Sequence, residues 1–395
     1  MSKEFSFEDL NKEMSKISQY GDTLDKSTIS DIDEYIPSGN YMLNACLTGS
    51  LFRGYPNNRS VCIAGPSGTG KTYLILNSIR EAQKKGYYII FYDSENAVDK
   101  SLVEKFGIDP KKMRYEPCNT VQEFRSSVTA LTDTLIEQKK KGIAIPKVMI
   151  ILDSAGNLAT QKEVEDAKSG SDKADMTRAK LLKSTFRILM TKMGICKIPF
   201  IFSNHTYMTQ DLFAKQVGGG GTGPEYAASV IMFLGKAKLT EGSEHTGIVV
   251  TVKPNKNRFA KPIPVKIHIS FNKGMNPYVG LEEFINWDTC GIQRGNILTD
   301  KQYEKLSESE KKDCRPMCDK DGVLTGYFAP KDSARKLVVR HLNDSVELNR
   351  LFTSEIITKE VLDELDENVI MPMFTYHTED ADEFYLEEDS EEQDV

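Results

Sequence analysis

Apolar stretches of strand length alternate with amphipathic stretches of helix length between about residue 36 and residue 277. The stretches that favour buried strands are 60–64, 87–92, 147–152 and 199–203, and those that favour helices are 71–85, 120–141 and 175–193. Alternation of this kind predicts an α/β fold with a mostly parallel central sheet flanked by helices. Three further strand-like stretches, 229–234, 246–252 and 263–270, predict an antiparallel extension of that sheet.

The pattern changes at both ends of this core, which predicts four parts. Residues 1–35 form an N-terminal segment, in which Phe5, Phe7, Leu10, Met14 and Ile17 mark a short amphipathic helix. Residues 36–281 form the core, and 282–378 form a small C-terminal domain that is charged and reads as helical at 299–313, 333–344 and 357–367. Residues 379–395 form an acidic tail of a composition that is usually disordered.

Charge and composition describe a protein that is not embedded in a membrane. No run of about 18 apolar residues exists, and the charged N-terminus lacks the apolar stretch of a secretory signal, which predicts a cytoplasmic protein. The net charge is −7, but the acidic tail holds ten acidic and no basic side chains, so the remaining chain carries +3. The tail is either a solubilising segment or a mobile polyanion that competes with DNA for a basic groove.

The strongest local signal is a phosphate-binding loop between a predicted strand and a predicted helix. It matches G-x-x-x-x-G-K-[ST] in full and consists of Gly65, Pro66, Ser67, Gly68, Thr69, Gly70, Lys71 and Thr72. Glycines let backbone N–H groups converge on phosphate, and the following helix directs its positive end at the anion. We therefore predict ATP and Mg²⁺ as ligands, with Lys71 on the β- and γ-phosphates and Thr72 on the metal.

Acidic residues follow two other predicted strands. Asp153 comes directly after a buried run, where a carboxylate is costly unless it meets a cation or donors, so we predict that it holds Mg²⁺ together with Thr72. Asp93 and Glu95 follow the strand 87–92, and on an extended chain they point the same way. We predict that Glu95 is the general base of hydrolysis; a solvated loop acid is the alternative.

Several sequence blocks line up in order with one family. They are IPSGNYMLNACLTGSLFRG, GPSGTGKT, FYDSE, IILDSAGNLATQKEVEDA, DMTRAKLLKSTFRI, SNHTYMTQDLF with GGGGTGP, and NKGMNPYVGL, and they cover roughly residues 36–282. On these blocks the chain resembles the RecA-like recombinases, most closely their T-even phage (UvsX-type) branch. The resemblance implies a RecA-type P-loop ATPase core and a helical polymer in which ATP lies between neighbouring subunits.

The resemblance also implies roles for residues around the nucleotide. Glu95 falls at the position of the family's catalytic glutamate, and Asn204 and His205 at a polar pair that senses the γ-phosphate. Lys256 and Arg258 match basic residues that reach the ATP of the next subunit; surface salt bridges are the alternative. Asp99 and Leu102 match the positions that contact adenine, but Leu102 replaces an aromatic side chain, which leaves nucleotide specificity less determined than phosphate chemistry.

Two DNA-binding loops follow from the same resemblance. The second loop, about 206–223, directly follows the polar pair, so a γ-phosphate contact could order it. Its expected DNA contacts are Tyr207, Phe213, Lys215, Gly218, Gly219, Gly220 and Gly221, since aromatics stack on bases and lysine meets phosphate; a flexible turn with a buried Phe213 is the alternative. The first loop, about 157–176, offers Lys162, Lys168 and Lys173, with Arg178 just after it, among five acidic residues, so a solvated loop stays open.

Together these features predict an ATP-dependent recombinase that coats single-stranded DNA and pairs it with a homologous duplex. The expected partners are single-stranded DNA, homologous duplex DNA and further copies of the chain, with a single-strand-binding protein and a mediator as additional candidates. The residues 1–35 would dock on a neighbouring subunit. A hexameric RecA-fold helicase, a regulatory ATPase or recombination mediator, and a filament protein that binds ATP without cleaving it are the rivals. The short segment before the core argues against the first, and the glycine-rich loop argues against the second.

Overall fold

The computed structural model describes residues 5–18, 20–170, 177–208, 216–218 and 227–376. The chain divides into two compact units, each assembled from separated stretches. The first consists of residues 1–39, 53–237 and 250–258, and the second of 40–52, 238–249 and 259–395. Among the described residues, no helix combines the length and apolar character needed to cross a bilayer.

A nine-stranded sheet with the order β13-β12-β11-β10-β3-β7-β6-β4-β5 is the central element. Its strands are β3 (Ser60–Ala64), β4 (Tyr88–Asp93), β5 (Met113–Pro117), β6 (Val148–Asp153), β7 (Phe200–Asn204), β10 (Val230–Glu241), β11 (Glu244–Asn257), β12 (Val265–Ser270) and β13 (Gly274–Met275). The six strands from β10 to β5 pair in parallel, and β12 and β13 pair antiparallel. The predicted α/β class with its mostly parallel sheet is confirmed.

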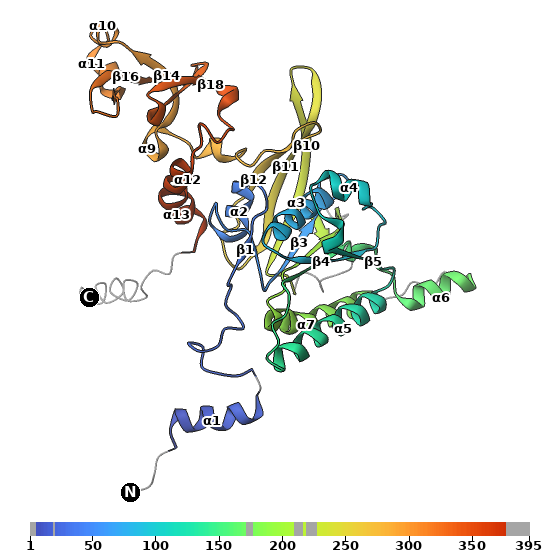
Figure 1. Ribbon diagram of the computed structural model, residues 1–395. Coiled ribbons are helices and arrows are strands. Elements are labelled where there is room, and N and C mark those ends of the chain that lie inside the picture. The colour runs from blue at the N-terminus through green and yellow to red at the C-terminus, as the bar shows by residue number, and fades with distance from the viewer. Residues whose placement is uncertain (1–4, 19, 171–176, 209–215, 219–226, 377–395) are drawn as a thin grey trace, which may run out of the picture. The chain divides into compact units, whose positions relative to one another are not determined.

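Helices cover both faces of the parallel strands (Figure 1). The helices of the first unit are α1 (Phe7–Ile17), α3 (Lys71–Lys84), α4 (Lys100–Lys105), α5 (Val121–Lys140), α6 (Gln161–Ser169) and α7 (Arg178–Cys196). α5 and α7 pack side by side on one face, where Phe124, Phe186, Phe200 and Phe202 form stacked and tilted ring pairs in the core. α3 and α4 lie on the other face (Figure 1).

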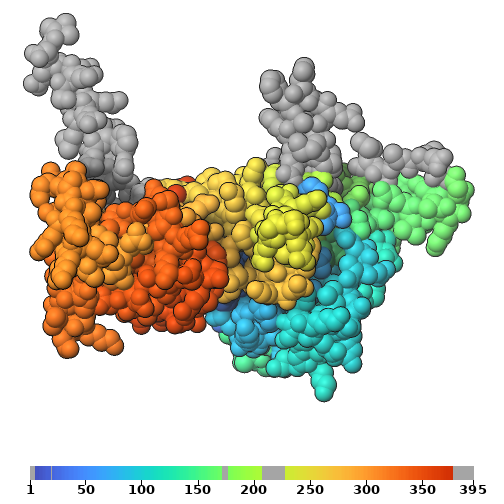
Figure 2. All heavy atoms as spheres, turned by 90° about the horizontal axis from the view of Figure 1, so that it is seen from above, coloured from blue at the N-terminus to red at the C-terminus, as the bar shows by residue number. Residues whose placement is uncertain are grey.

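Two elements of the first unit present few buried side chains. None of the side chains of α1 is buried, and its apolar positions are exposed, including Phe7 at 70% and Ile17 at 83%. α6 projects from the rest of this unit (Figure 2) and also buries no residue. The prediction of a loop at 157–176 is therefore wrong for α6, because Thr160 and Glu163 form a capping box that starts a helix there.

The second unit holds a five-stranded antiparallel sheet with the order β15-β16-β14-β17-β18. The strands are β14 (Ile292–Leu298), β15 (Arg315–Cys318), β16 (Leu324–Pro330), β17 (Lys336–Val339) and β18 (Asp344–Glu347). The prediction of a helix at 333–344 is wrong, because its four-residue run KLVV is β17 and buries Leu337, Val338 and Val339. Short helices α10 (Asp300–Tyr303) and α11 (Glu308–Asp313) do lie within 299–313.

The last described segment packs onto α2 (Tyr41–Thr48) of the same unit. It consists of α12 (Lys359–Leu365), a π-helical turn η6 (Asp366–Ile370) and α13 (Met371–Phe374). The carboxylate of Asp366 is 4% exposed and accepts from the hydroxyl of Ser50 at 2.6 Å and from the backbone N–H of Leu51 at 2.7 Å. A buried acid with two donors anchors this segment to the turn after α2. The remaining short elements are β1 (Tyr35–Ile36), β2 (Tyr55–Pro56), β8 (Thr206–Met208), β9 (Gln216–Gly218), α9 (Trp287–Cys290) and single helical turns η1 to η5.

Candidate active site at the carboxyl ends of the parallel strands

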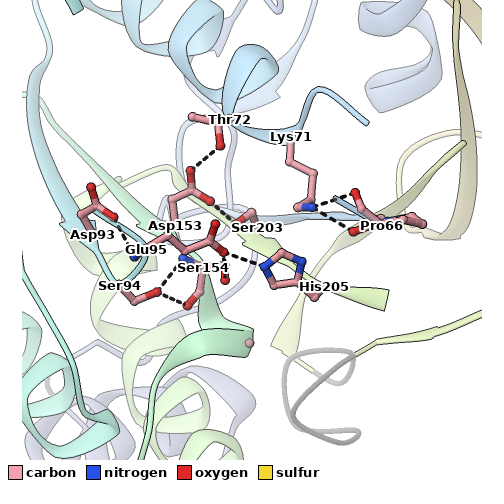
Figure 3. Close-up of polar contacts among 12 residues, drawn as sticks. Pro66, Lys71, Thr72, Asp93, Ser94, Glu95, Asp153, Ser154, Ser203 and His205 are labelled. Carbon is pink, nitrogen blue, oxygen red and sulfur yellow. Dashed lines mark hydrogen bonds and ion pairs between the residues drawn. The ribbon is translucent and has the colours of Figure 1, made fainter. Parts of the chain in front are cut away.

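The phosphate-binding loop leaves the end of β3 and enters α3. Gly68 and Gly70 have φ values of 70° and 90°, a region that favours glycine, so the loop can turn tightly into the helix. The buried ammonium group of Lys71 donates to the carbonyl oxygens of Gly65 at 2.9 Å and Pro66 at 3.0 Å (Figure 3). Burial lowers the pKa of Lys71, although neighbouring carboxylates partly offset this effect.

Asp153 stands at the end of β6, directly opposite Thr72. The Thr72 hydroxyl donates to Oδ2 of Asp153 at 2.8 Å, and the Ser203 hydroxyl donates to Oδ1. Burial raises the pKa of Asp153 above its usual range, and the two hydroxyl donors only partly oppose this. A hydroxyl and a carboxylate are the oxygen ligands that Mg²⁺ takes, and a buried acid with a raised pKa gains most from a cation. These residues therefore fit the metal that the sequence predicts.

Glu95 contacts two side chains, one directly after β6 and one directly after β7 (Figure 3). Its Oε1 atom accepts from the hydroxyl of Ser154 at 2.6 Å and lies 2.7 Å from Nε2 of His205. Burial acts to raise the pKa of Glu95, but the hydrogen bonds from Ser154 and His205 outweigh it, so the pKa is lowered. The carboxylate is thus held in its ionised form, which a general base requires.

Asp93 does not point the same way as Glu95, so this part of the sequence prediction is wrong. β4 ends at Asp93, and the chain then turns through Asn96, which has a φ of 53°. Oδ1 of Asp93 accepts from the backbone N–H groups of Glu95 and Asn96, both at 2.8 Å, and Oδ2 accepts from the Tyr115 hydroxyl at 3.0 Å. Asp93 therefore fixes the turn that carries Glu95 and remains buried itself.

The predicted polar pair stands at the end of β7, beside the phosphate-binding loop. Asn204 is buried, and its carbonyl oxygen accepts from the N–H of Gly65 at 3.1 Å. His205 follows and leads directly into β8, whose backbone pairs antiparallel with β9. The stretch expected to contact DNA thus begins one residue after the side chain that touches Glu95.

Lys256 and Arg258, which are predicted to reach the ATP of a neighbouring subunit, lie near the strand ends opposite to the phosphate-binding loop. The backbone N–H of Arg258 donates to the Ser229 carbonyl at 3.2 Å, and Ser229 precedes β10 and bonds in turn to Ser60, the first residue of β3. The phosphate-binding loop follows the last residue of β3, about 16 Å away for a five-residue strand. Arg258 therefore lies at the opposite end of the strands from the phosphate-binding loop of its own chain. Lys256 precedes it near the end of β11.

Basic side chains gather around Arg258. A hollow of about 590 Å³ is lined by Arg59, Lys183, Arg187 and Arg258. Burial and repulsion by Arg258 both lower the pKa of Arg59. This edge therefore attracts anions.

The predicted adenine and DNA contacts are distributed over several elements. Asp99 caps α4 by accepting from the N–H of Leu102 at 2.7 Å. Lys162 and Lys168 lie on α6, and the Arg178 guanidinium donates to the carbonyl of Gly156 within its own chain. Gly218 and the backbone of Tyr207 lie in the β8–β9 pair. The other predicted DNA contacts, Lys173, Phe213, Lys215, Gly219, Gly220 and Gly221, lie outside the described residues.

Four residues of the site were not assigned from the sequence. Ser154 and Ser203 bond to the two central carboxylates, Tyr115 bonds to Asp93, and Lys236 donates to the carbonyl of Ser67. Each serine is next to an assigned residue at a strand end, and this position in the sequence could have identified both serines as site residues. Nothing local marks Tyr115 or Lys236, because they reach the site only through the pairing of β5 and β10 with their neighbours.

Comparisons with known proteins agree with this arrangement. The profile of the RecA N-terminal domain matches residues 4–276. The chain is 34% identical over 243 residues to the "Recombination and repair protein" of Enterobacteria phage T4, which is 61% of this chain and 60% of that protein. It is 28% identical over 260 residues to "Protein RecA" of Treponema denticola, which is 65% of this chain and 59% of that protein.

The chain is also similar to a plant protein. The chain is 29% identical over 229 residues to "DNA repair protein recA homolog 3, mitochondrial" of Arabidopsis thaliana, which is 56% of this chain and 50% of that protein. The matches thus span about half to three fifths of these relatives. Since the RecA N-terminal domain profile covers well over half of the chain, including every strand end of the candidate site, the chain belongs to the RecA N-terminal domain family.

Proposed function

We propose that this chain is an ATP-dependent recombinase that polymerises on single-stranded DNA and pairs it with a homologous duplex. The observation that carries the proposal is the contact of Glu95 with His205, one residue before the stretch expected to bind DNA. It joins a hydrolytic carboxylate to that stretch through one side chain. A regulatory ATPase without DNA loops has no need of such a link, and the phage and bacterial relatives named for recombination and RecA function support the same reading.

The nucleotide would lie along the loop between β3 and α3. The loop amides and the N-terminus of α3 bind phosphate, and Lys71 exchanges its two carbonyl acceptors for phosphate oxygens. Thr72 and Asp153 would hold Mg²⁺, which neutralises charge on the phosphates when bound. Asp99 and Leu102 would border the adenine, where an aliphatic side chain covers the base without stacking on it.

Glu95 would accept the proton of the attacking water. Its lowered pKa keeps it ionised near neutral pH, and Asp93 holds its backbone turn in place. His205 and Ser154 both contact Oε1 of Glu95. If His205 turns toward a γ-phosphate, Glu95 becomes available for water and the start of β8 moves with it, which couples ATP to DNA binding.

Assembly would complete the site. Arg258 and Lys256 lie at the opposite end of the strands from the phosphate-binding loop of their own chain, so the ATP that they contact would belong to a neighbouring subunit. They would act as arginine fingers, which supply positive charge to the transition state only after polymerisation. The exposed apolar face of α1 is the candidate for the second contact between subunits.

DNA contacts would come from both predicted loops. Lys162, Lys168, Lys173 and Arg178 belong to the first, and Tyr207, Phe213, Lys215 and Gly218 to Gly221 to the second. Contacts to backbone and base faces make binding sequence-independent and salt-sensitive. A single-strand-binding protein and a mediator are further candidate partners, and we expect the protein to act in the cytoplasm, that of a bacterial host if it comes from a phage.

Electron microscopy of the full chain tests the proposal. The protein is mixed with single-stranded DNA, Mg²⁺ and a slowly hydrolysed ATP analogue, and Lys71→Ala serves as the matched control that lacks the phosphate-binding cation. We expect open helical filaments from the parent protein under these conditions and none from Lys71→Ala. Closed six-membered rings would favour a RecA-fold helicase, and isolated particles without DNA would favour a regulatory ATPase.

A further inference from the structure

Lys236 reaches the phosphate-binding loop from a strand that sequence analysis did not connect with it. β10 pairs in parallel with β3, with Phe233 opposite Ala64, the residue before the loop. β3 ends there, but β10 continues to Glu241. A side chain on Gly65 would lie 3.0 Å from the Leu234 carbonyl oxygen, so β10 passes directly beside the loop.

The ammonium group of Lys236 contacts the tip of the phosphate-binding loop. Its Nζ atom donates to the Ser67 carbonyl at 3.1 Å. It also lies 2.8 Å from the point that a side chain on Gly68 would occupy. The loop motif permits any residue at position 68; the φ of 70° favours glycine there, and the absence of a side chain leaves room for Lys236.

Two ammonium groups thus bond to one short loop. Lys71 bonds to the carbonyls of Gly65 and Pro66, and Lys236 bonds to that of Ser67. Besides burial, which is the larger cause, repulsion by Lys236 contributes to the lowered pKa of Lys71. Phosphate oxygens are stronger partners for ammonium groups than neutral carbonyls, so a polyanion bound to this loop would gain contacts with both lysines.

We infer that Lys236 is a second phosphate-binding cation, which contacts the terminal phosphate of a nucleoside triphosphate bound to its own subunit. The inference rests on the proposed nucleotide site. The helix end and the loop amides hold the inner phosphates, so a cation at the tip of the loop is left to face the outermost one. Lys236 therefore favours a triphosphate over a diphosphate.

Nucleotide affinity of the full chain without DNA tests this role. Fluorescent ATP and ADP analogues are titrated at fixed ionic strength into the parent protein and into Lys236→Met, Lys236→Arg and Lys71→Ala. Lys238→Met is the matched control, because it removes the same charge from an exposed lysine two residues along the same strand. Thermal melting of each variant shows that it is folded.

We expect Lys236→Met to weaken ATP binding about tenfold and ADP binding less than threefold, as the loss of one charge-assisted hydrogen bond implies. Lys236→Arg retains most of the affinity, and Lys238→Met changes neither ligand by more than about twofold. Equal weakening of ATP and ADP, or a Lys236→Met variant that matches Lys238→Met, overturns the inference. If the parent protein binds neither nucleotide and Lys71→Ala is the same, the proposed function fails instead.

Discussion

Removing the Ser154 hydroxyl tests whether its hydrogen bond keeps Glu95 ionised. Ser154 donates to Oε1 of Glu95 at 2.6 Å, and this bond is one of two that lower the pKa of the acid against the effect of burial. In Ser154→Ala the base itself, the metal ligands and the loop remain. The pKa of Glu95 should therefore rise, and turnover should fall only where pH approaches that pKa from above.

The size of the effect follows from the bond that is lost. A hydrogen bond to a charged group contributes about 1.5–3 kcal/mol. The Glu95 side chain keeps 23% of its exposure, so solvent compensates in part and the lower end applies. About 1.5 kcal/mol corresponds to roughly a tenfold smaller ionised fraction of Glu95 on the acid side of its titration, with little change at higher pH.

The assay is phosphate release stimulated by single-stranded DNA, measured at saturating ATP across the acidic and neutral range. Ser94→Ala is the matched control, because the Ser94 hydroxyl bonds to the backbone N–H and carbonyl of Ser154 but not to Glu95. We expect the acid limb of the Ser154→Ala profile to move to higher pH and that of Ser94→Ala to keep its position. A uniform loss of turnover at every pH, or an unmoved acid limb in Ser154→Ala, would refute the assignment of Glu95 as a base tuned by Ser154.

Four other outcomes follow from the same structure. Glu95→Gln should lower kcat by about 10²–10⁴ with ATP affinity retained, and unchanged turnover would show that another group is the base. Asp366→Ala leaves two buried donors unpaired and should cost roughly 2–5 kcal/mol in urea unfolding, whereas Ala at the half-exposed Asp363, which pairs with the exposed Lys359, should cost under about 0.5 kcal/mol; equal costs would contradict the anchoring role. Arg258→Ala should abolish DNA-stimulated turnover while dispersed subunits still bind ATP; turnover at the parent rate would place Arg258 outside the neighbouring site. Deletion of 379–395 should tighten DNA binding at low salt, and no change would leave the tail a solubilising role only.

The C-terminal part shows where local pattern misled. A run of three apolar side chains within charged sequence fits one turn of a helix as well as a short strand. Lys336–Val339 is a strand because β14 and β18 flank it and provide its hydrogen bonds, from positions that no local pattern identifies. By contrast, the long helices α5 and α7 and the buried strands β3, β6 and β7 each lie within about three residues of their predicted bounds, since their periodicity extends over enough residues to be distinctive.

The sequence by itself determined the phosphate-binding loop and the fact that Asp153, Glu95 and the Asn204–His205 pair each follow a buried strand. It could do so because motif, burial and strand ends are properties of contiguous residues. Only the tertiary structure decided that β6 lies between β4 and β7, which brings Glu95 against both Ser154 and His205. Only the pairing of β10 with β3 placed Lys236 on a loop 169 residues away. Contacts of this kind depend on the order of strands across the sheet, and that order is set by the packing of the whole domain.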